Sequence, residues 1–408
     1  MLVENLVRDT LEIKNHRVVS VEGDLNHLDV YLDRKKCRHL PCGKCGKLSP
    51  VRDRRSERKW LHVPLWGIKV YIHYRPTRIM CEDCGLQMEA IPWSMGKSPL
   101  TRQLVAFLAF WARYLAWDVL ARFFGFSWGT IASAVKKAVD YGLQHRDTSD
   151  VVYIGIDEIS IKKGHNYLTV IYDLACKRLI WSGEDRKEET LQRFYQEWGP
   201  DRTARIGGIC MDMWKPYLKV AQKKCPEATI VFDKFHVIKH LHEAVDEVRK
   251  EEARELQKTN PQLLKGSKYI FLKNPWNLTP KQVARFGYLS KLNLRINKAY
   301  ILKEAFRKLW EYRDISSAKA YLNQWIWWAT HSRLKPLVKF GKLLRNHMDG
   351  ILAWFQVPID NGATEAMNNN CKQISHRAHG FRKPETFIYN MYHCLGQLPL
   401  PQTTHRFV

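Results

Sequence analysis

The chain has 408 residues, and its 66 Lys and Arg residues outnumber its 41 Asp and Glu residues, which gives a formal net charge of +25. This length is enough for two to four structural units. Because no apolar run approaches the roughly 20 residues of a membrane span and the N-terminus lacks the apolar core of a secretion signal, we expect a cytoplasmic, nucleoid-associated protein and no membrane partner. The positive charge extends along the chain and predicts a polyanionic partner, most simply nucleic acid, with a generic basic surface as the alternative.

Two CxxC motifs, CGKC and CEDC, mark the first predicted domain, residues 1–95. Each motif holds two thiolates on one tight turn, and two such pairs complete a closed tetrahedral zinc site. We therefore predict a structural Zn²⁺ bound by Cys42, Cys45, Cys81 and Cys84. The segment between the motifs alternates as β-strands do and contains a Trp-Gly turn. Cys37 and His39 are nearby and can replace one ligand, and free thiols or a redox pair are the alternative to a metal site.

Residues 101–142 have helical periodicity, and we predict a helix-turn-helix DNA-binding domain over residues 96–148. A first helix is predicted to end at Gly125, and Ser127 can cap a second helix. Many helical hairpins share this pattern, and the net charge is what favours contact with DNA. The predicted DNA-binding residues are Ser127, Thr130, Ser133, Lys136 and Lys137.

Residues 149–240 change to strand patterns and begin with VVYIGIDEIS, in which Asp157 stands inside an apolar run. A buried carboxylate needs a cation, a hydrogen-bond network or a metal, so an edge strand that turns Asp157 to water is the alternative interpretation. Three antiparallel strands are predicted first, followed by helix, strand, helix and strand, with Asp212 and Asp233 at the ends of the last two strands. This order is the one expected of a ribonuclease-H-like catalytic domain, of which these residues would form the first part.

Residues 241–355 are helical and aromatic, and they predict an all-helical domain. Its clustered tryptophans are expected in the core, with a base-stacking platform as the alternative: Trp325, Trp327 and Trp328. Residues 356–408 form the last predicted segment. Glu365 lies near a helix start there, with Thr364 as its candidate cap. Polar and basic residues that can hold a metal or a phosphate follow on the same helix: Asn368, Lys372 and Arg377.

Phosphodiester chemistry gives a reason for three acids from distant segments to converge. Two hard cations bound by carboxylate oxygens can activate the attacking oxygen and stabilise the leaving oxygen. Asp157 would come from the first strand, Asp212 from the end of the neighbouring fourth strand, and Glu365 from a later helix packed over both. We therefore predict a site for two Mg²⁺ ions, for which Mn²⁺ can substitute.

Three stretches follow two CxxC motifs and a helix-turn-helix: GIDEISIKKGHNYLTVIYDL, VFDKFHVIKHL and DNGATEAMNNNCKQISHRAHGF. In this combination the chain resembles the bacterial insertion-sequence transposases of the ISL-three family, which are DDE-class enzymes. The resemblance implies an α+β multidomain fold in which a helical insertion, residues 241–355, interrupts a ribonuclease-H-like α/β catalytic domain that residues 356–408 complete. It also implies Mg²⁺-dependent cleavage and strand transfer, with Asp157 as the first acid and Glu365 as the last.

The second acid is open between Asp212 and Asp233. The pattern of related transposases with a helical insertion favours Asp212 as the catalytic residue. Asp233 would then form an accessory pair with His236 that orients a ligand or a DNA phosphate. Ala366 stands after Glu365 where the family often has Gly.

The leading hypothesis is a transposase that binds the terminal inverted repeats of its insertion sequence and joins the released ends to target DNA. Its partners would be double-stranded DNA and further copies of the chain, because pairing two ends requires a homodimer or higher oligomer. A catalytically silent DNA-binding regulator derived from a transposase is the alternative, although it has no need for three acids. A structure-selective nuclease of the same fold is a third hypothesis, and the N-terminal recognition domains argue against it.

Overall fold

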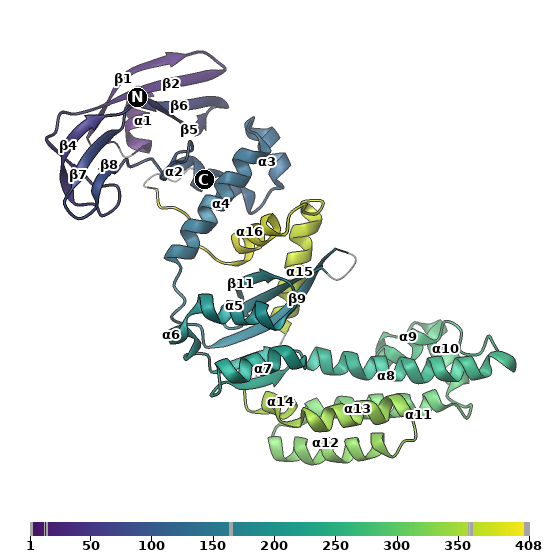
Figure 1. The fold of residues 1–408 in the computed structure, drawn as a ribbon. Coiled ribbons are helices and arrows are strands. Elements are labelled where there is room, and N and C mark those ends of the chain that lie inside the picture. The colour runs from purple at the N-terminus through teal and green to yellow at the C-terminus, as the bar shows by residue number, and fades with distance from the viewer. Residues whose placement is uncertain are drawn as a thin grey trace. The chain divides into compact units, whose positions relative to one another are not determined.

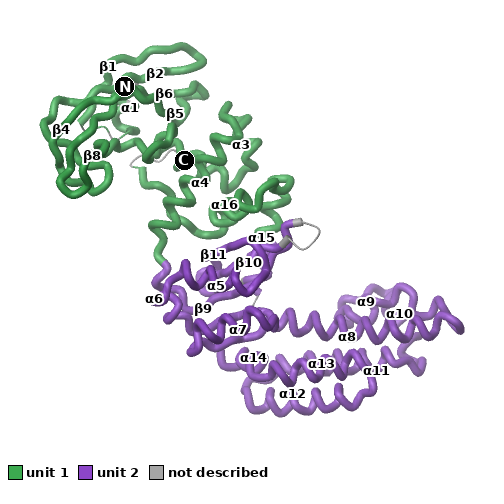
Figure 2. The backbone as a smooth tube through the Cα atoms, in the orientation of Figure 1, with its two compact units in different colours: residues 1–147, 370–408 green, residues 148–369 purple. Residues whose placement is uncertain are grey.

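The computed structural model describes residues 3–11, 13, 15–162, 166–357, 359 and 362–403, without the side chains of Val3, Glu4, Leu6, Lys162, Asn166 and Ala363. The chain forms two compact units (Figure 2). The first unit combines residues 1–147 with residues 370–408, and the second consists of residues 148–369. Along the described part of the chain, no helix has the length and apolar character that crossing a membrane requires.

Two four-stranded sheets and helix α1 (Val3–Thr10) form the N-terminal part of the first unit (Figure 1). One sheet has the order β1-β2-β6-β5, and the other has the order β3-β4-β7-β8. The strands are β1 (His16–Gly23), β2 (His27–Arg34), β3 (His39–Pro41), β4 (Leu48–Arg54), β5 (Arg58–Leu65), β6 (Ile68–Tyr74), β7 (Thr77–Cys81) and β8 (Gly85–Met88). The β5–β6 hairpin turns at Trp66 and Gly67, whose φ angles of 51° and 82° are left-handed. The Trp-Gly turn predicted from the sequence is thereby confirmed.

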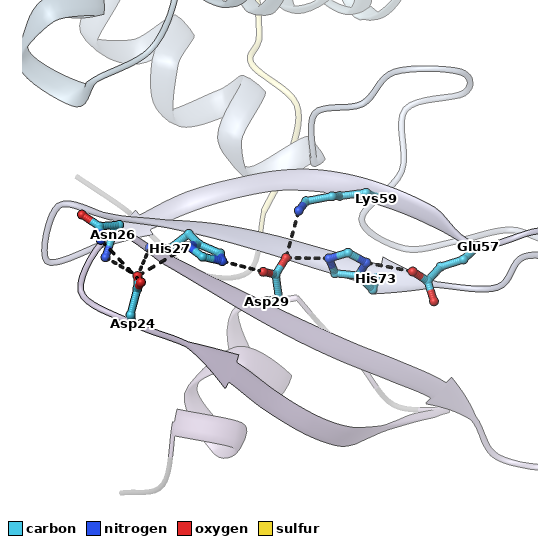
Figure 3. Close-up of polar contacts among 7 residues, drawn as sticks. All are labelled: Asp24, Asn26, His27, Asp29, Glu57, Lys59 and His73. Carbon is cyan, nitrogen blue, oxygen red and sulfur yellow. Dashed lines mark hydrogen bonds and ion pairs between the residues drawn. The ribbon is translucent and has the colours of Figure 1, made fainter.

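Charged side chains connect β2, β5 and β6 on the polar face of the first sheet (Figure 3). Asp29 Oδ1 lies 2.6 Å from His73 Nε2 and 3.0 Å from Lys59 Nζ. The other ring nitrogen of His73, Nδ1, lies 2.9 Å from Glu57 Oε1, and His27 Nε2 lies 3.2 Å from Asp29 Oδ2. Such cross-strand pairs stabilise the register of the strands. The opposite face is apolar and holds the core residues Val30, Leu32, Trp60, Val70 and Ile72.

Three helices follow the sheets: α2 (Arg102–Ala112), α3 (Trp117–Phe124) and α4 (Trp128–His145). α3 ends at Gly125, whose φ of 65° is left-handed. At the start of α4, Ser127 Oγ accepts a hydrogen bond from the backbone N–H of Thr130 at 3.1 Å. The helix end and the cap predicted from the sequence are both confirmed. In the same unit, α16 (Pro384–Leu395) packs on α2 and α4, and His393 Nε2 lies 2.6 Å from the carbonyl oxygen of Ala109.

A five-stranded sheet forms the centre of the second unit, in the order β11-β10-β9-β12-β13. Neighbouring strands among β9, β10 and β11 are antiparallel, whereas β12 runs parallel to both β9 and β13. The strands are β9 (Tyr153–Lys162), β10 (Asn166–Asp173), β11 (Arg178–Glu184), β12 (Gly208–Met211) and β13 (Thr229–Phe232). The predicted succession of strands and helices is therefore present. The alternative interpretation of Asp157 on an edge strand is wrong, because β9 lies between β10 and β12.

Helices cover both faces of this sheet. On one face, Leu191 and Phe194 of α5 (Glu188–Trp198) pack with Val220 of α7 (Lys215–Lys224) against the apolar side chains of β9 and β12. α6 (Pro200–Thr203) connects α5 to β12. On the other face, Cys210 and Ala353 belong to one buried cluster, and α15 (Gly362–Arg377) begins nearby in the chain. Asp212 and Asp233 thus follow strands that are packed between apolar clusters on both faces of the sheet.

The helices between β13 and α15 form a core that extends to Phe232 of β13. These elements are α8 (Lys234–Glu255), η1 (Leu256–Lys258), α9 (Lys268–Leu272), η2 (Pro275–Asn277), α10 (Pro280–Leu289), α11 (Arg295–Arg307), η3 (Lys308–Glu311), α12 (Ile315–Thr330), α13 (Lys335–Asn346), α14 (Met348–Leu352) and η4 (Ala353–Phe355). Trp325 is fully buried, as predicted, and its indole N–H donates to the carbonyl oxygen of Leu302 at 2.9 Å. Trp328 is partly buried against the same core. The core prediction is wrong for Trp327, which is 59% exposed and stacks on His331, because it lies on the outer side of α12.

Candidate active site

Asp157 lies within β9 and is largely buried, and this burial raises the pKa of its carboxyl. Its Oδ1 accepts the backbone N–H of Glu158 at 2.8 Å. Its Oδ2 accepts the side-chain amide of Asn368 at 2.6 Å. The buried acid therefore has the hydrogen-bond network that the sequence required of it.

Asn368 connects β9 and β10 to helix α15. Its Oδ1 accepts the hydroxyl of Tyr172 at 2.9 Å, while its Nδ2 donates to Asp157. One turn earlier on α15, the fully buried Thr364 lies against β9, where a Cβ built on Gly155 would be 2.7 Å from its hydroxyl oxygen. Gly155 therefore permits the close approach of helix and strand that lets Asn368 reach Asp157.

Glu365 is exposed on the first turn of α15. Because it precedes Asn368 by three residues, it lies on a neighbouring position of the same helix face. The prediction that Thr364 caps this helix is wrong, since α15 already begins at Gly362 and Thr364 is packed inside it. The contact between Asn368 and Asp157 thus joins α15, the helix that carries Glu365, to β9, the strand that carries Asp157.

Asp212 directly follows β12, the strand that pairs with β9. Its side chain is half-buried, and its Oδ1 accepts the backbone N–H of Met213 at 2.6 Å. The negative charge of Asp212 raises the pKa of Glu158 and also that of His236. Asp212 therefore belongs to the same electrostatic neighbourhood as the residues that follow β9 and β13.

Asp233 and His236 form a close pair at the end of β13. Asp233 is 4% exposed, and its Oδ1 accepts the backbone N–H of Phe235 at 2.9 Å at the start of α8. Its Oδ2 lies 2.6 Å from His236 Nδ1. Burial acts to lower the pKa of His236, but the hydrogen bond to Asp233 and the charges of Asp212 and Asp157 raise it to about 9. The imidazole is therefore a cation at neutral pH.

Glu158 and Arg186 are functional candidates that the sequence reasoning missed. Burial raises the pKa of Glu158 to about 7, although the positive charge of Arg186 acts in the opposite direction. Arg186 Nε lies 3.1 Å from Glu158 Oε1, and its guanidinium group lies 4.7 Å from the centre of the Trp214 ring. Strand alternation predicts that Glu158 faces the opposite side of the sheet from Asp157, but no local signal indicates Arg186 as its partner.

The three predicted catalytic acids are not gathered around a common point in this structure. Among the described residues, two groups have ligand atoms within 4.8 Å of one another, and neither contains Asp157, Asp212 or Glu365. The catalytic triad accordingly stays a prediction. One of the two groups joins Asp150 and Asp173 to Cys176, and there Arg178 already forms ion pairs with both acids.

The other group consists of the four predicted zinc ligands: Cys42, Cys45, Cys81 and Cys84. The first pair follows β3, and the second pair runs from Cys81 at the end of β7 to Cys84 just before β8 of the same sheet. Cys45 Sγ lies 3.6 Å from Cys81 Sγ, and the backbone N–H of Lys44 points to Cys42 Sγ at 3.5 Å. Within the described residues, Cys37 and His39 are not part of this group. Four sulfurs on two turns are the donor set that tetrahedral Zn²⁺ takes.

The predicted DNA-binding residues lie at the start and along the outer side of α4. Ser127 and Lys136 are exposed, and Thr130, Ser133 and Lys137 are partly buried. Lys136 is already engaged, since its Nζ lies 3.2 Å from Glu385 Oε1. On α15, Lys372 is exposed, whereas Arg377 donates a hydrogen bond to the carbonyl oxygen of Arg113 at 2.7 Å.

Comparison with known proteins finds a matching family and similar transposases. The family model for DDE transposases of the ISL-three type, described as "Transposase", matches residues 154–391, which is more than half of the chain. The transposase for insertion sequence element IS1001 of Bordetella parapertussis is 29% identical over 365 residues, covering 88% of this chain and 90% of that protein. The transposase for insertion sequence element IS1557 of Mycobacterium tuberculosis (strain CDC 1551 / Oshkosh) is 27% identical over 372 residues, covering 85% of this chain and 84% of that protein. The chain therefore belongs to the ISL-three family of insertion-sequence transposases.

Proposed function

We propose that this protein binds the terminal inverted repeats of its insertion sequence and catalyses metal-dependent DNA cleavage and strand transfer. The observation that carries the proposal is the hydrogen bond from Asn368 to Asp157, which joins a central strand to the helix of Glu365. The order β11-β10-β9-β12-β13, with three antiparallel strands and two parallel ones, supports a ribonuclease-H-like catalytic domain. Family membership supports the same reaction class.

Asp157, Asp212 and Glu365 are the proposed ligands for two Mg²⁺ ions. Carboxylate oxygens are the ligands that Mg²⁺ prefers, and the ions, once bound, activate the attacking oxygen and stabilise the leaving oxygen. Asp212 suits this role better than Asp233 because Asp212, like Asp157, is partly exposed, whereas Asp233 is 4% exposed. Asp233 in addition holds the start of α8 through Phe235 N–H and pairs with His236.

The neighbouring residues position the acids and the DNA. Asn368 holds the Asp157 carboxylate in one orientation, and Tyr172 fixes the amide of Asn368 from the other side. Asp233 holds His236, whose positive charge can bind a DNA phosphate beside the acids. Charge at this point would otherwise be strongly negative, so the cation also lowers the repulsion between the acids and the DNA backbone.

DNA recognition is assigned to the N-terminal segments. The proposed zinc-binding domain covers residues 1–95 and the proposed helix-turn-helix domain covers residues 96–148. Zn²⁺ would be held by the four-cysteine group, and α4 would contact DNA through its exposed residues. We further propose that at least two copies act together, because two element ends must be joined to one target.

A cleavage assay tests the proposed function. Full-length protein is incubated with a duplex taken from the DNA that flanks its gene, in the presence of Mg²⁺ or of EDTA. We expect nicks at the element ends and strand-transfer products with Mg²⁺ alone. Tight binding without any cleavage would replace the proposal by a DNA-binding regulator, and cleavage that ignores DNA sequence would replace it by a nuclease.

A further inference from the structure

A cavity of about 530 Å³ lies in the first unit, between the two helices of the helix-turn-helix and the loop that connects α15 to α16. This volume is in the range of sites for small molecules. The cavity wall combines aromatic and basic side chains, among them Trp117, Trp128, Phe381, Arg377, Arg382 and Lys383. Aromatic rings beside cations are the chemistry that proteins use to bind unpaired nucleotides.

Two helix N-termini meet at this cavity. α3 begins at Trp117 after the N-cap residue Ala116, and α16 begins at Pro384 after the N-cap residue Lys383. Neither N-cap side chain accepts a hydrogen bond from its helix, and both N-cap residues line the cavity. Free backbone N–H groups at a helix N-terminus bind anions, and phosphate in particular.

The charges around the cavity favour an anion as well. Its lining acid Asp118 forms an ion pair with Arg122, whose Nη2 lies 3.2 Å from Asp118 Oδ2. Arg382 and Lys383 are exposed, and no acid within the described residues forms an ion pair with either of them. Arg382 and Lys383 are therefore available to a ligand, while Asp118, the acid that lines the cavity, is paired with Arg122.

The two tryptophans of the wall provide evidence that is independent of the helix N-termini. The Trp117 and Trp128 ring centres are 5.6 Å apart. Trp128 is 50% exposed, whereas 6% of Trp117 is exposed and its indole N–H is buried. The wall therefore offers an aromatic surface at Trp128, against which Trp117 packs from behind.

We propose that this cavity binds a single nucleotide that has left base pairing. Its phosphate would lie at the N-termini of α3 and α16 beside Arg382 and Lys383, and its base would lie against Trp117 and Trp128. A base inside a duplex cannot enter such a cavity, so the nucleotide must be unstacked or come from a single strand. The inference rests on the proposed DNA-binding function and adds to it a site for one unpaired nucleotide.

Competition binding to full-length protein tests this inference. The probe is a single-stranded oligonucleotide that carries one 5-iododeoxyuridine, and the competitors are deoxynucleoside monophosphates, deoxyribose 5-phosphate and inorganic phosphate. We expect the nucleotides to compete at least about tenfold better than either phosphate without a base, because stacking supplies much of the affinity. Photocrosslinking should place the iodouracil on a peptide that contains Trp117 or Trp128.

Single-site variants separate this site from general DNA affinity. Trp128→Leu removes the exposed ring and should weaken nucleotide binding about fivefold or more, because the base loses its stacking partner. Arg382→Gln together with Lys383→Gln should weaken it about tenfold or more. Trp66→Leu and Lys97→Gln are matched controls in the same unit, since both residues are exposed and lie outside the cavity wall, and they should have no effect.

The outcomes distinguish this inference from the function on which it rests. Equal competition by inorganic phosphate and by nucleotides would show an anion site without base recognition and would overturn the inference. Crosslinks outside the cavity and unchanged binding in the variants would also overturn it, while cleavage of element ends leaves the proposed function standing. Failure to bind or cleave element ends, by contrast, would overturn the proposed function itself.

Discussion

The side-chain amide of Asn368 donates a hydrogen bond to Asp157 Oδ2 at 2.6 Å. It thereby connects a helix near the end of the chain to the central strand of the sheet. The same amide accepts the Tyr172 hydroxyl at 2.9 Å, so its orientation is fixed from two sides. Because Glu365 precedes Asn368 by three residues on the same helix, this contact links the helix of Glu365 to the strand of Asp157.

Replacement of Asn368 tests this role. We expect Asn368→Ala to reduce DNA cleavage by about 10- to 100-fold, in the range found for residues that orient metal ligands. The free energy of unfolding should fall by only about 1 kcal/mol, because a single hydrogen bond is lost. Asn369→Ala is the matched control, since Asn369 is exposed on the same helix. Equal cleavage activity of the two variants would contradict the proposed role of Asn368 in orienting Asp157.

Gly155 should tolerate no side chain. A Cβ at this position would lie 2.7 Å from the hydroxyl oxygen of Thr364 and 2.7 Å from Leu174 Cδ2. We expect Gly155→Ala to lower the free energy of unfolding by about 1–3 kcal/mol and to reduce cleavage, because α15 must move away from β9. Gly287→Ala is the control: nothing lies within 4 Å of its Cβ, and alanine should stabilise α10 slightly. Chemical denaturation of both variants provides the comparison.

The raised pKa of His236 predicts that the stability of the fold depends on pH. Its pKa rises from 6.5 to about 9 in the folded protein, so folding stabilises the protonated form. This contribution, on the order of 2 kcal/mol, is complete below pH 6.5 and is lost as the pH rises through about 9. We expect the difference in unfolding free energy between the wild type and His236→Gln to shrink over that interval. His331→Gln, at an exposed position, serves as the control.

If the difference in unfolding free energy between the wild type and His236→Gln stays constant from pH 6 to pH 10, His236 is not held as a cation. His236→Gln should in addition weaken cleavage, since the proposed phosphate contact is lost. The loss of DNA binding caused by His236→Gln should become smaller as the salt concentration rises, as for other charge contacts to DNA.

Zinc content tests the four-cysteine group. We expect one Zn²⁺ per chain in the wild type, measured by atomic spectroscopy, and none in Cys81→Ser. Chelation should increase hydrogen exchange across residues 37–90, because structural zinc contributes to folding. Cys37→Ser is the control and should keep its zinc, since Cys37 is not part of the group. Zinc loss in Cys37→Ser, or its retention in Cys81→Ser, would contradict the assignment.

Features that depend on local spacing could be predicted from the sequence. The two CxxC motifs determine which four sulfurs meet, and Gly125 and Ser127 determine where one helix ends and the next begins. Asp157 was recognisable because an acid interrupts an apolar strand. In each case the signal lies within a few residues of the feature that it predicts.

Contacts between distant segments were not predictable in the same way. Tyr172 and Asn368 are 196 positions apart, and their hydrogen bond depends on how α15 crosses the sheet. The partner of Glu158 is Arg186, which nothing in the strand pattern indicates. Trp327 shares the helical spacing of its buried neighbours but lies on the outer side of α12. Which side of a helix is buried depends on tertiary packing, which a single sequence does not display.

The measurement that tests the central claim most directly compares acid variants in the cleavage assay on element ends with Mg²⁺. Asp157→Asn, Asp212→Asn and Glu365→Gln should each reduce cleavage by at least about a thousandfold, because a metal ligand contributes several kcal/mol to the reaction. DNA binding should persist in all three, and Asp233→Asn should weaken cleavage far less. Loss of cleavage mainly in Asp233→Asn would move the second acid to Asp233. Retained cleavage in Glu365→Gln would contradict the proposed triad.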